Sequence, residues 1–335
     1  MTDATELVTE IEALSEKLTT ARASIGKRII GQPQVVDLAL ATILCGGHGL
    51  LIGLPGLAKT RLVETLATVM GLQGNRVQFT PDLMPADILG SEVLETAADG
   101  TRSFRFIEGP VFCQLLMADE INRASPRTQS ALLQAMQERQ VTIAGRERRL
   151  GHPFHVMATQ NPLEQEGTYP LPEAQLDRFL LRIDVQYPDR ESERQVLLAT
   201  TGTEEARSER IFTAAELIAA QETVRRMPVG DAILDLILDL VRSCRPDEKG
   251  APEIVRETVS WGPGPRAAQA LMLAVRARAL LAGRLAPSAE DVGALARAVL
   301  SHRMALSFAA RAQDVRLTDV IDQVVARVTR IEAAA

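Results

Sequence analysis

Residues 53–60 combine the amino-acid types of a phosphate-binding loop, Gly-Leu-Pro-Gly-Leu-Ala-Lys-Thr. An apolar run at 49–52 precedes them and an apolar-periodic stretch follows, which predicts a strand, a glycine-rich turn and a helix. Backbone N–H groups of such a turn, together with the helix dipole, bind phosphate. In this pattern Lys59 contacts the β- and γ-phosphates and the Thr60 hydroxyl ligates Mg²⁺. Ala58 replaces the second glycine, which suits the loop if its φ is negative. The alternative is an ordinary strand–turn–helix joint with a chance Lys-Thr pair.

Two acidic residues end a second apolar run. Residues 114–120 read Gln-Leu-Leu-Met-Ala-Asp-Glu, as expected of a buried parallel strand that carries carboxylates to the end of a sheet. Asp119 is then placed to hold Mg²⁺, and Glu120 to orient and polarise an attacking water. A strand followed by a solvated acidic turn would look the same in isolation. The phosphate-binding loop earlier in the chain favours the nucleotide site.

A third strand signal, at 154–159, leads into Gln160-Asn161-Pro162. The uncharged amide of Asn161 could sense a γ-phosphate or share the water with Glu120. Asn-Pro is also a common turn dipeptide. The functional interpretation of Asn161 therefore depends on its place in a series of strand ends.

Composition and charge exclude several classes of protein. The 335 residues suffice for two domains, and 46% hydrophobic with 3% aromatic residues predicts cores of Leu, Ala, Val and Ile. A net charge of −6 argues against a dominant attraction to nucleic acid. The three cysteines fit no metal spacing, so we expect reduced thiols and no zinc, and we expect His152 and His155 to be structural or solvent-exposed. No apolar run approaches a membrane span and the first twenty residues lack a signal-peptide core, which predicts a cytoplasmic protein without a membrane partner.

Alternating strand and helix signals predict an α/β fold: a P-loop domain with a parallel sheet flanked by helices, followed by a smaller all-α lid domain. We expect an N-terminal amphipathic helix at 1–22, the nucleotide-binding domain at 23–188 and the helical lid at 189–335. Strands are expected at 49–53, 76–79, 114–119, 154–159 and 180–186, and helices at 59–70 and 126–138.

Two insertions interrupt this alternation, at 81–110 and 139–152, and both are predicted β-hairpins. The first spans 91–107 and turns at Ala98-Asp99-Gly100. The second spans 140–150, turns at Ala144-Gly145 and carries three arginines near its tip: Arg146, Arg148 and Arg149. These arginines contact a partner or merely protect a strand edge.

Arg266 ends the segment Trp-Gly-Pro-Gly-Pro-Arg at 261–266, which predicts a tight turn into a helix that begins near this residue. An arginine in the first turn opposes the helix dipole, so a bound anion would explain it. The alternative is a hydrated surface arginine.

Together these motifs resemble the AAA+ ATPases, and specifically the MoxR family, over nearly the whole chain from Ile30 onward. The most specific segments are 53–60, 109–112 (Gly-Pro-Val-Phe), 118–126 (Ala-Asp-Glu-Ile-Asn-Arg-Ala-Ser-Pro) and 169–179 (Tyr-Pro-Leu-Pro-Glu-Ala-Gln-Leu-Asp-Arg-Phe). Ala58 agrees with the MoxR pattern. The hairpin at 91–107 resembles the helix-2 insert, and the hairpin at 140–150 resembles the pre-sensor-1 hairpin.

The resemblance implies a site for ATP and Mg²⁺, with Thr60 and Asp119 on the metal and Glu120 as the Walker B glutamate. It implies that Asn161 is the sensor-1 residue. The residues implied to bind the nucleotide are Ile30, Gly31, Gln32, Gly53, Leu54, Pro55, Gly56, Leu57, Ala58, Lys59, Thr60 and Arg61.

Contacts between subunits also follow from the resemblance. Arg178 matches the arginine finger, which reaches a neighbouring subunit's nucleotide. Arg266 matches the sensor-2 arginine of the lid, and the resemblance leaves open whether it acts within its own subunit or on a neighbour. Arg123 and Arg127 are further candidates for contacts between subunits.

The function implied is ATP hydrolysis by a homo-oligomeric ring, a hexamer as in relatives, that remodels, assembles or activates a protein partner. Metal or cofactor insertion is one form of such maturation, and a separate von Willebrand factor A domain protein is the implied partner. The alternatives are a nucleic-acid-dependent motor, a chelatase motor subunit and a non-hydrolysing nucleotide-gated scaffold. Few aromatic residues count against the first, and the intact Asp119–Glu120 pair counts against the last.

Overall fold

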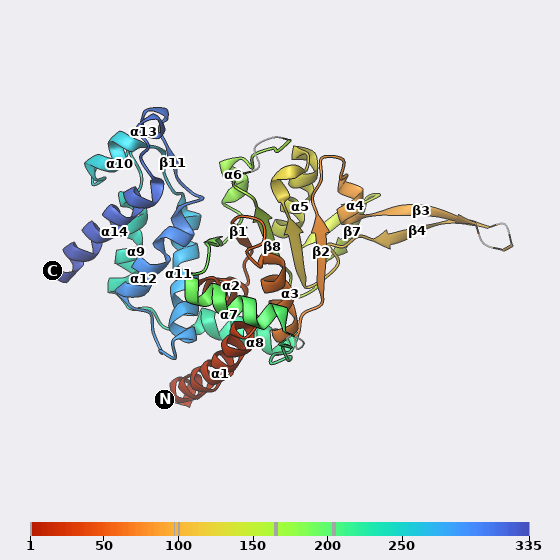
Figure 1. Cartoon of the computed structure of the whole chain (residues 1–335), viewed down its shortest axis with the longest axis horizontal. Coiled ribbons are helices and arrows are strands. Elements are labelled where there is room, and N and C mark those ends of the chain that lie inside the picture. Colours follow the sequence, from red (N-terminus) through yellow and green to blue (C-terminus); the bar gives the residue numbers. More distant parts are fainter. Residues whose placement is uncertain (1, 97, 100, 164–166, 203–205, 335) are drawn as a thin grey trace.

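A parallel β-sheet forms the centre of the first domain in the computed structural model (Figure 1). The structure describes residues 2–96, 98–99, 101–163, 167–202 and 206–334. The sheet has five strands in the order β2-β5-β8-β1-β9, and every neighbouring pair is parallel. The predicted α/β fold is therefore confirmed. The strands are β1 (Gly49–Ile52), β2 (Gly74–Gln78), β5 (Leu115–Asp119), β8 (His155–Gln160) and β9 (Leu181–Asp184).

Helices cover the sheet and fix the points where its strands end. The N-terminal helix is longer than predicted, and α5 has the predicted bounds. Its start is set by Ser125, whose hydroxyl accepts a hydrogen bond from the Thr128 N–H at 3.3 Å, and by Pro126 in the first turn. The helices of this part are α1 (Thr2–Gly26), α2 (Pro33–Leu44), α3 (Lys59–Val69), α5 (Pro126–Glu138), the short α6 (Glu173–Leu176) and α7 (Arg190–Thr201).

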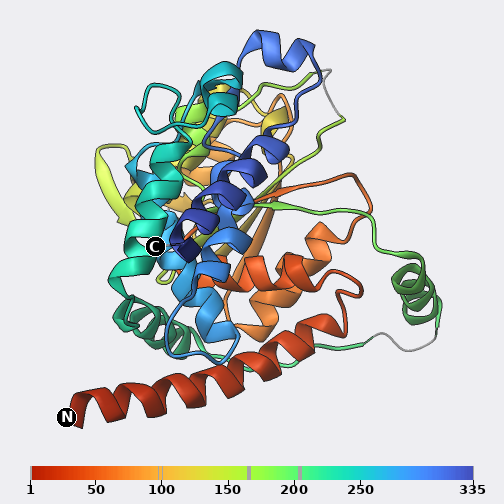
Figure 2. The same cartoon turned by 90° about the vertical axis from the view of Figure 1, so that its left-hand side faces the viewer.

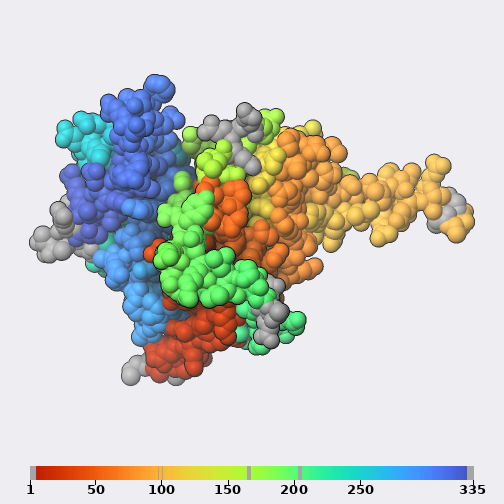
Figure 3. Space-filling model, in the orientation of Figure 1, coloured from red at the N-terminus to blue at the C-terminus, as the bar shows by residue number. Residues whose placement is uncertain are grey.

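Both predicted hairpins are present. After the short helix α4 (Pro85–Leu89), β3 (Gly90–Thr96) and β4 (Arg102–Glu108) form an antiparallel arm that projects from the body of the molecule (Figures 1 and 3). The predicted turn at 98–100 includes Gly100, which lies outside the described residues. The second hairpin pairs β6 (Gln140–Ile143) with β7 (Arg146–Arg149) through Ala144 and Gly145, whose φ angles are +50° and +76°.

Arg148 does not share the surroundings of the other two arginines of its hairpin. Its guanidinium lies 3.8 Å from the centre of the Phe106 ring and 3.7 Å from the Glu92 carboxylate, and both of these residues belong to the projecting arm. Arg146 and Arg149 are exposed. Arg148 therefore joins the two hairpins, and the alternatives of partner contact and edge protection stay open for Arg146 and Arg149.

Helices dominate the C-terminal part of the chain, as predicted. It also contains a two-stranded ladder that the sequence does not predict, β10 (Val259–Trp261) with β11 (Ala305–Leu306), because strands of two or three residues have no readable period. Figure 2 shows α1 running beneath these helices. They are α8 (Ala214–Arg226), α9 (Asp231–Ser243), α10 (Glu253–Thr258), α11 (Pro265–Leu281), α12 (Ala289–Leu300), α13 (Phe308–Ala312) and α14 (Leu317–Ala334).

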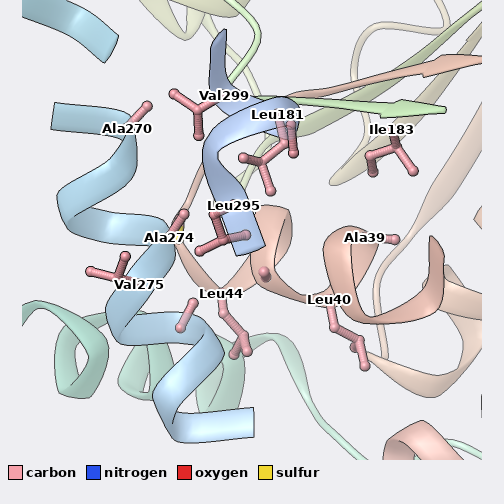
Figure 4. Packing of buried hydrophobic residues seen from close by; sticks show 14 of the residues in the cluster. Ala39, Leu40, Leu44, Leu181, Ile183, Ala270, Ala274, Val275, Leu295 and Val299 are labelled. Carbon is pink, nitrogen blue, oxygen red and sulfur yellow. The ribbon is translucent and has the colours of Figure 1, made fainter. Parts of the chain in front are cut away.

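One hydrophobic core joins the lid to the sheet domain (Figure 4). Leu40 and Leu44 of α2 and Leu181 of β9 pack in the same cluster as Ala274 of α11 and Leu295 of α12, and all five are at most 2% exposed. Burying each of the four leucine side chains stabilises by about 1.5–3 kcal/mol. The lid is therefore held against β9, the edge strand of the sheet.

Two predictions about polar and sulfur-containing residues can be compared with the structure. His155 is 1% exposed, with Nδ1 2.9 Å from the Gly47 carbonyl oxygen, whereas His152 is exposed. Burial lowers the pKa of His155 to about 4, so its role is structural. All three cysteines are buried free thiols.

Over the described parts of the chain, no helix is both long and apolar enough to cross a membrane.

Candidate nucleotide site

The loop at 53–60 connects the carboxyl end of β1 to the start of α3. Gly56 has a φ of +82°, and Ala58, which precedes the first helical residue, has a φ of +57°. The condition of a negative φ, under which alanine would suit this position, is therefore not met. The loop requires the left-handed conformation at this position even without glycine, which costs about 1–2 kcal/mol for a residue with a Cβ. Alanine adds the smallest side chain that has this cost.

Lys59 bends back over its own loop. Its Nζ donates hydrogen bonds of 2.7 Å to the carbonyl oxygens of Gly53 and Leu54. Partial burial lowers the pKa of Lys59, while the charges of Asp119 and Glu120 raise it. The ammonium group is thus held at the mouth of the loop and is close enough to both acids to interact with them.

A cavity of about 400 Å³ separates the loop from the ends of β5 and β8. Its walls include loop residues from Pro55 to Arg61 on one side and Asp119, Glu120, Thr159 and Asn161 on the other. The motifs that lie far apart in the sequence therefore face one space, because they follow adjacent parallel strands at the same edge of the sheet.

Asp119 is the last residue of β5 and is 8% exposed. One of its carboxylate oxygens accepts a 2.6 Å hydrogen bond from the Thr159 hydroxyl. The other accepts from the Arg76 guanidinium at 2.7 Å. Both oxygens are thus held in position, and Arg76 neutralises the charge that a divalent cation would use.

Glu120 follows with a φ of +56°, a conformation that turns its side chain away from the course of the strand. Its N–H donates to the Thr159 hydroxyl oxygen at 2.8 Å. Its carboxylate accepts from the Gln78 amide at 2.7 Å and from the Arg123 guanidinium at 3.1 Å. Arg123, a candidate for contact between subunits, is therefore bonded within its own site, whereas Arg127 is exposed on α5.

Sequence reasoning missed Arg76 and Gln78. They alternate along β2, so their side chains share one face of the strand, and β2 is hydrogen-bonded to β5 with Gln78 opposite Asp119. The sequence signal that could have identified them as site residues was the presence of two polar side chains at alternate positions of a predicted strand.

Asn161 is 7% exposed directly after β8, and its Oδ1 accepts a hydrogen bond from the Leu163 N–H at 3.1 Å. This leaves its amide nitrogen at the wall of the cavity without a partner among the described residues. The amide can donate to a phosphate oxygen or to a water held by Glu120.

A second, smaller cavity of about 100 Å³ shares Gly56, Leu57, Ala58 and Arg61 with the first. Ile30 and Gln32 line it from the segment before α2, and Val196 and Ala199 line it from α7. Gly31, Gly53 and Leu54 instead border a wider cleft toward the lid. The first cavity is lined mainly by polar residues and the second has a largely apolar surface, a combination that suits a nucleotide.

The donor set fits a nucleotide with magnesium. A carboxylate from Asp119 and a hydroxyl from Thr60, at the start of α3, are the oxygen ligands that Mg²⁺ prefers. Lys59 and the positive end of α3 offer charge to phosphate oxygens. The residues present therefore fit both groups in the chemistry of their donors.

Arg178 and Arg266 lie in a different cavity. It is lined by Gly47 and His48, which precede β1, and by Leu180, which precedes β9. The loop at 53–60 follows the opposite end of β1. Four paired positions, Gly49–Ile52 with Leu181–Asp184, separate the two edges, a length of roughly 10 Å or more at about 3.3 Å per residue.

Comparison with known proteins agrees with this architecture. Residues 48–181 match the ATPase family associated with various cellular activities (AAA), and residues 251–324 match the AAA lid domain. The chain is 41% identical to chaperone MoxR1 of Mycobacterium tuberculosis over 92% of its own length and 80% of that protein. The chain belongs to the MoxR family of AAA+ ATPases. It is also 33% identical to protein MoxR of Paracoccus denitrificans, covering 86% of this chain and 88% of that one.

A solved structure extends the likeness of this MoxR-family chain to three dimensions. The crystal structure of a presumed ATPase from Cytophaga hutchinsonii superposes with a TM-score of 0.87 at 36% identity. The match covers 97% of each chain. The lid is therefore placed on the sheet domain in the same way in both proteins.

Proposed function

We propose that this MoxR-family protein hydrolyses ATP with Mg²⁺ in a homo-oligomeric ring and uses the reaction to remodel, assemble or activate a protein partner. The observation that carries the proposal is the cavity between the loop at 53–60 and the ends of β5 and β8, which brings Lys59, Thr60, Asp119, Glu120 and Asn161 together.

Each residue has a separate task in this proposal. Lys59 turns from the loop carbonyls to the β- and γ-phosphates of ATP. Thr60 and Asp119 would hold Mg²⁺, which would supply positive charge beside the phosphate oxygens. Glu120 orients the attacking water, and Asn161 donates to that water or to the γ-phosphate. Arg76 would have to release one oxygen of Asp119 for that oxygen to ligate the metal. Gln78 and Arg123 hold the carboxylate of Glu120 in position.

The positions of Arg178 and Arg266 support the proposal of a ring. Arg178 and Arg266 lie at the amino edge of the sheet, whereas the nucleotide cavity of the same chain lies at the carboxyl edge. We therefore propose that both act on the nucleotide of a neighbouring subunit, which for Arg266 is one of the two roles that the resemblance leaves open. A hexamer is the proposed ring size. The proposed domains of each chain are the N-terminal helix at 1–22, the nucleotide-binding domain at 23–188 and the helical lid at 189–335.

The partner is proposed to be a protein. The name of the M. tuberculosis relative, a chaperone, supports this class, and a separate von Willebrand factor A domain protein is the proposed partner. The projecting arm and the hairpin β6–β7 are the elements that would contact it. A chelatase motor subunit would share the same site chemistry, whereas a nucleic-acid motor would show DNA- or RNA-stimulated hydrolysis that falls steeply with salt.

Phosphate release from ATP by the purified protein, with and without Mg²⁺, tests the proposal. Glu120→Gln is expected to bind ATP with unchanged affinity and to hydrolyse it at least roughly 100-fold more slowly, because an amide cannot act as a base for water. Lys59→Ala is expected to lose ATP binding. Glu95→Gln, on the exposed projecting arm, is the matched control and should behave as wild type. Normal turnover in Glu120→Gln would refute the assignment.

A further inference from the structure

Five arginines line the cavity at the amino edge of the sheet, which has a volume of about 290 Å³. We call it the cationic pocket, and its arginines are Arg139, Arg178, Arg225, Arg266 and Arg303. They come from the end of α5, the loop after α6, the last turn of α8, the first turn of α11 and the segment after α12. Such a concentration is unexpected in a chain with a net charge of −6.

One carboxylate, that of Asp177, lines the cationic pocket. Arg303 donates to it at 2.7 Å, and Arg266 lies 3.5 Å from its other oxygen. Arg303 is only 2% exposed and donates its remaining N–H groups to backbone carbonyls, those of Val299 and Phe179 at 2.7 Å among them. Asp177 and the carbonyls therefore satisfy Arg303, and Asp177 also pairs with Arg266, which leaves Arg139, Arg178 and Arg225 without a counter-charge among the residues that line the pocket.

The guanidinium groups of Arg139, Arg178 and Arg225 make no hydrogen bond or ion pair with any residue that the structure describes. A further arginine, Arg276 on α11, lies near Arg225. Burial lowers the pKa of Arg276, and the positive charge of Arg225 lowers it further. The Nε of Arg276 is buried without a hydrogen-bond partner in the described structure. Like charges brought together without counter-charges repel. A bound anion would offset this repulsion.

The shape of the pocket selects the kind of anion. α11 has 17 residues, and its N-terminus, with Arg266 in the first turn, adds the positive end of a helix dipole. Guanidinium groups bind phosphate oxygens in pairs of parallel hydrogen bonds. Several arginines that converge from separate elements suit a group with several charged oxygens, such as a polyphosphate, better than a single carboxylate.

We propose that Arg139 and Arg225 contact the phosphates of the nucleotide held by a neighbouring copy of this chain, beside Arg178 and Arg266. The inference rests on the proposed function, because it needs a nucleotide in the neighbour's loop. The neighbour is the source of the phosphates because Arg139, Arg225 and Arg266 are exposed in the single chain and open the pocket outward. The nucleotide cavity of the same chain lies beyond the opposite end of β1.

The test uses Arg139→Ala and Arg225→Ala, with Arg256→Ala on α10 as the matched control of an exposed lid arginine. Each pocket variant is expected to bind ATP as wild type does and to lose about 10- to 100-fold in kcat, the effect of one hydrogen bond to a charged group. Arg225→Lys should recover part of the loss. Unchanged kcat in both pocket variants, with hydrolysis by wild type intact, would overturn the inference and leave the proposed function standing.

Mixed assemblies identify the source of the phosphates. Lys59→Ala subunits have intact pocket arginines, so adding them to Arg139→Ala or Arg225→Ala subunits is expected to restore part of the turnover. Absence of recovery in assemblies shown by cross-linking to be mixed would mean that the arginines act within their own chain. Tight binding of inorganic tripolyphosphate to isolated Lys59→Ala subunits, lost in Arg225→Ala/Lys59→Ala, would identify a free anion as the ligand. Either result would overturn the assignment to a neighbour. No hydrolysis by wild type would refute the proposed function itself.

Discussion

At the scale of residues, the sequence identifies the side chains that face the nucleotide cavity when they belong to a contiguous motif. Lys59, Thr60, Asp119 and Glu120 are found in this way, and the structure brings them to one cavity. Arg76 belongs to no motif and contacts Asp119 only because β2 happens to neighbour β5. The positive φ of Ala58 also could not be predicted from the residue type, since the loop and not the alanine imposes it.

Arg76 gives a prediction at this scale. Its ion pair with Asp119 competes with the metal, so Arg76→Gln is expected to lower the Mg²⁺ concentration for half-maximal turnover. The decrease is roughly fivefold if the partly exposed pair contributes about 1 kcal/mol. A titration of phosphate release against Mg²⁺ measures it. Arg105→Gln, which removes an exposed ion pair with Glu95, is the control, and a higher Mg²⁺ requirement in Arg76→Gln would show that Arg76 supports the site.

At the scale of elements, periodicity and capping signals predict the long helices and buried strands well. Helix α5 begins at Pro126 because Ser125 caps it, and both residues can be read from the sequence. The contact between the two hairpins cannot be read in this way. Phe106 and Arg148 are 42 positions apart in the sequence, and their pairing depends on how two insertions fold back on the same domain.

Arg148 and its neighbours on the hairpin are expected to respond differently to substitution. Arg148→Ser removes the contacts with Phe106 and Glu92, a loss of about 0.5–1 kcal/mol for the cation–π contact, so amide hydrogen exchange in β3 and β4 should accelerate. The control Arg146→Ser/Arg149→Ser should leave this exchange and basal hydrolysis unchanged and should reduce stimulation by a protein partner.

Two outcomes would contradict this division of roles. Equal exchange in Arg148→Ser and wild type would mean that the hairpins are held together by other contacts. Aggregation of Arg146→Ser/Arg149→Ser, with partner stimulation retained by the folded fraction, would show that these two arginines only protect a strand edge.

At the scale of the whole molecule, topology decides what no motif shows. Arg178 and Arg266 are 88 positions apart, yet both line the cationic pocket. The register of β1 with β9 places that pocket at the sheet edge opposite the nucleotide loop. If these arginines act on a neighbour's nucleotide, as proposed, each chain alone has an incomplete site, and turnover depends on assembly.

Dilution of the protein provides the last prediction. Turnover per wild-type subunit is expected to fall when subunits separate, since the arginine finger contributes about 10³-fold or more in related phosphoryl-transfer sites. At a fixed low wild-type concentration, added Lys59→Ala subunits should raise turnover because they donate Arg178 without hydrolysing ATP themselves. Lys59→Ala/Arg178→Ala subunits are the matched control and should not raise it, although they assemble equally by light scattering. Equal stimulation by both would show that assembly alone activates the site, and turnover independent of concentration down to the monomer would mean that each chain completes its own site.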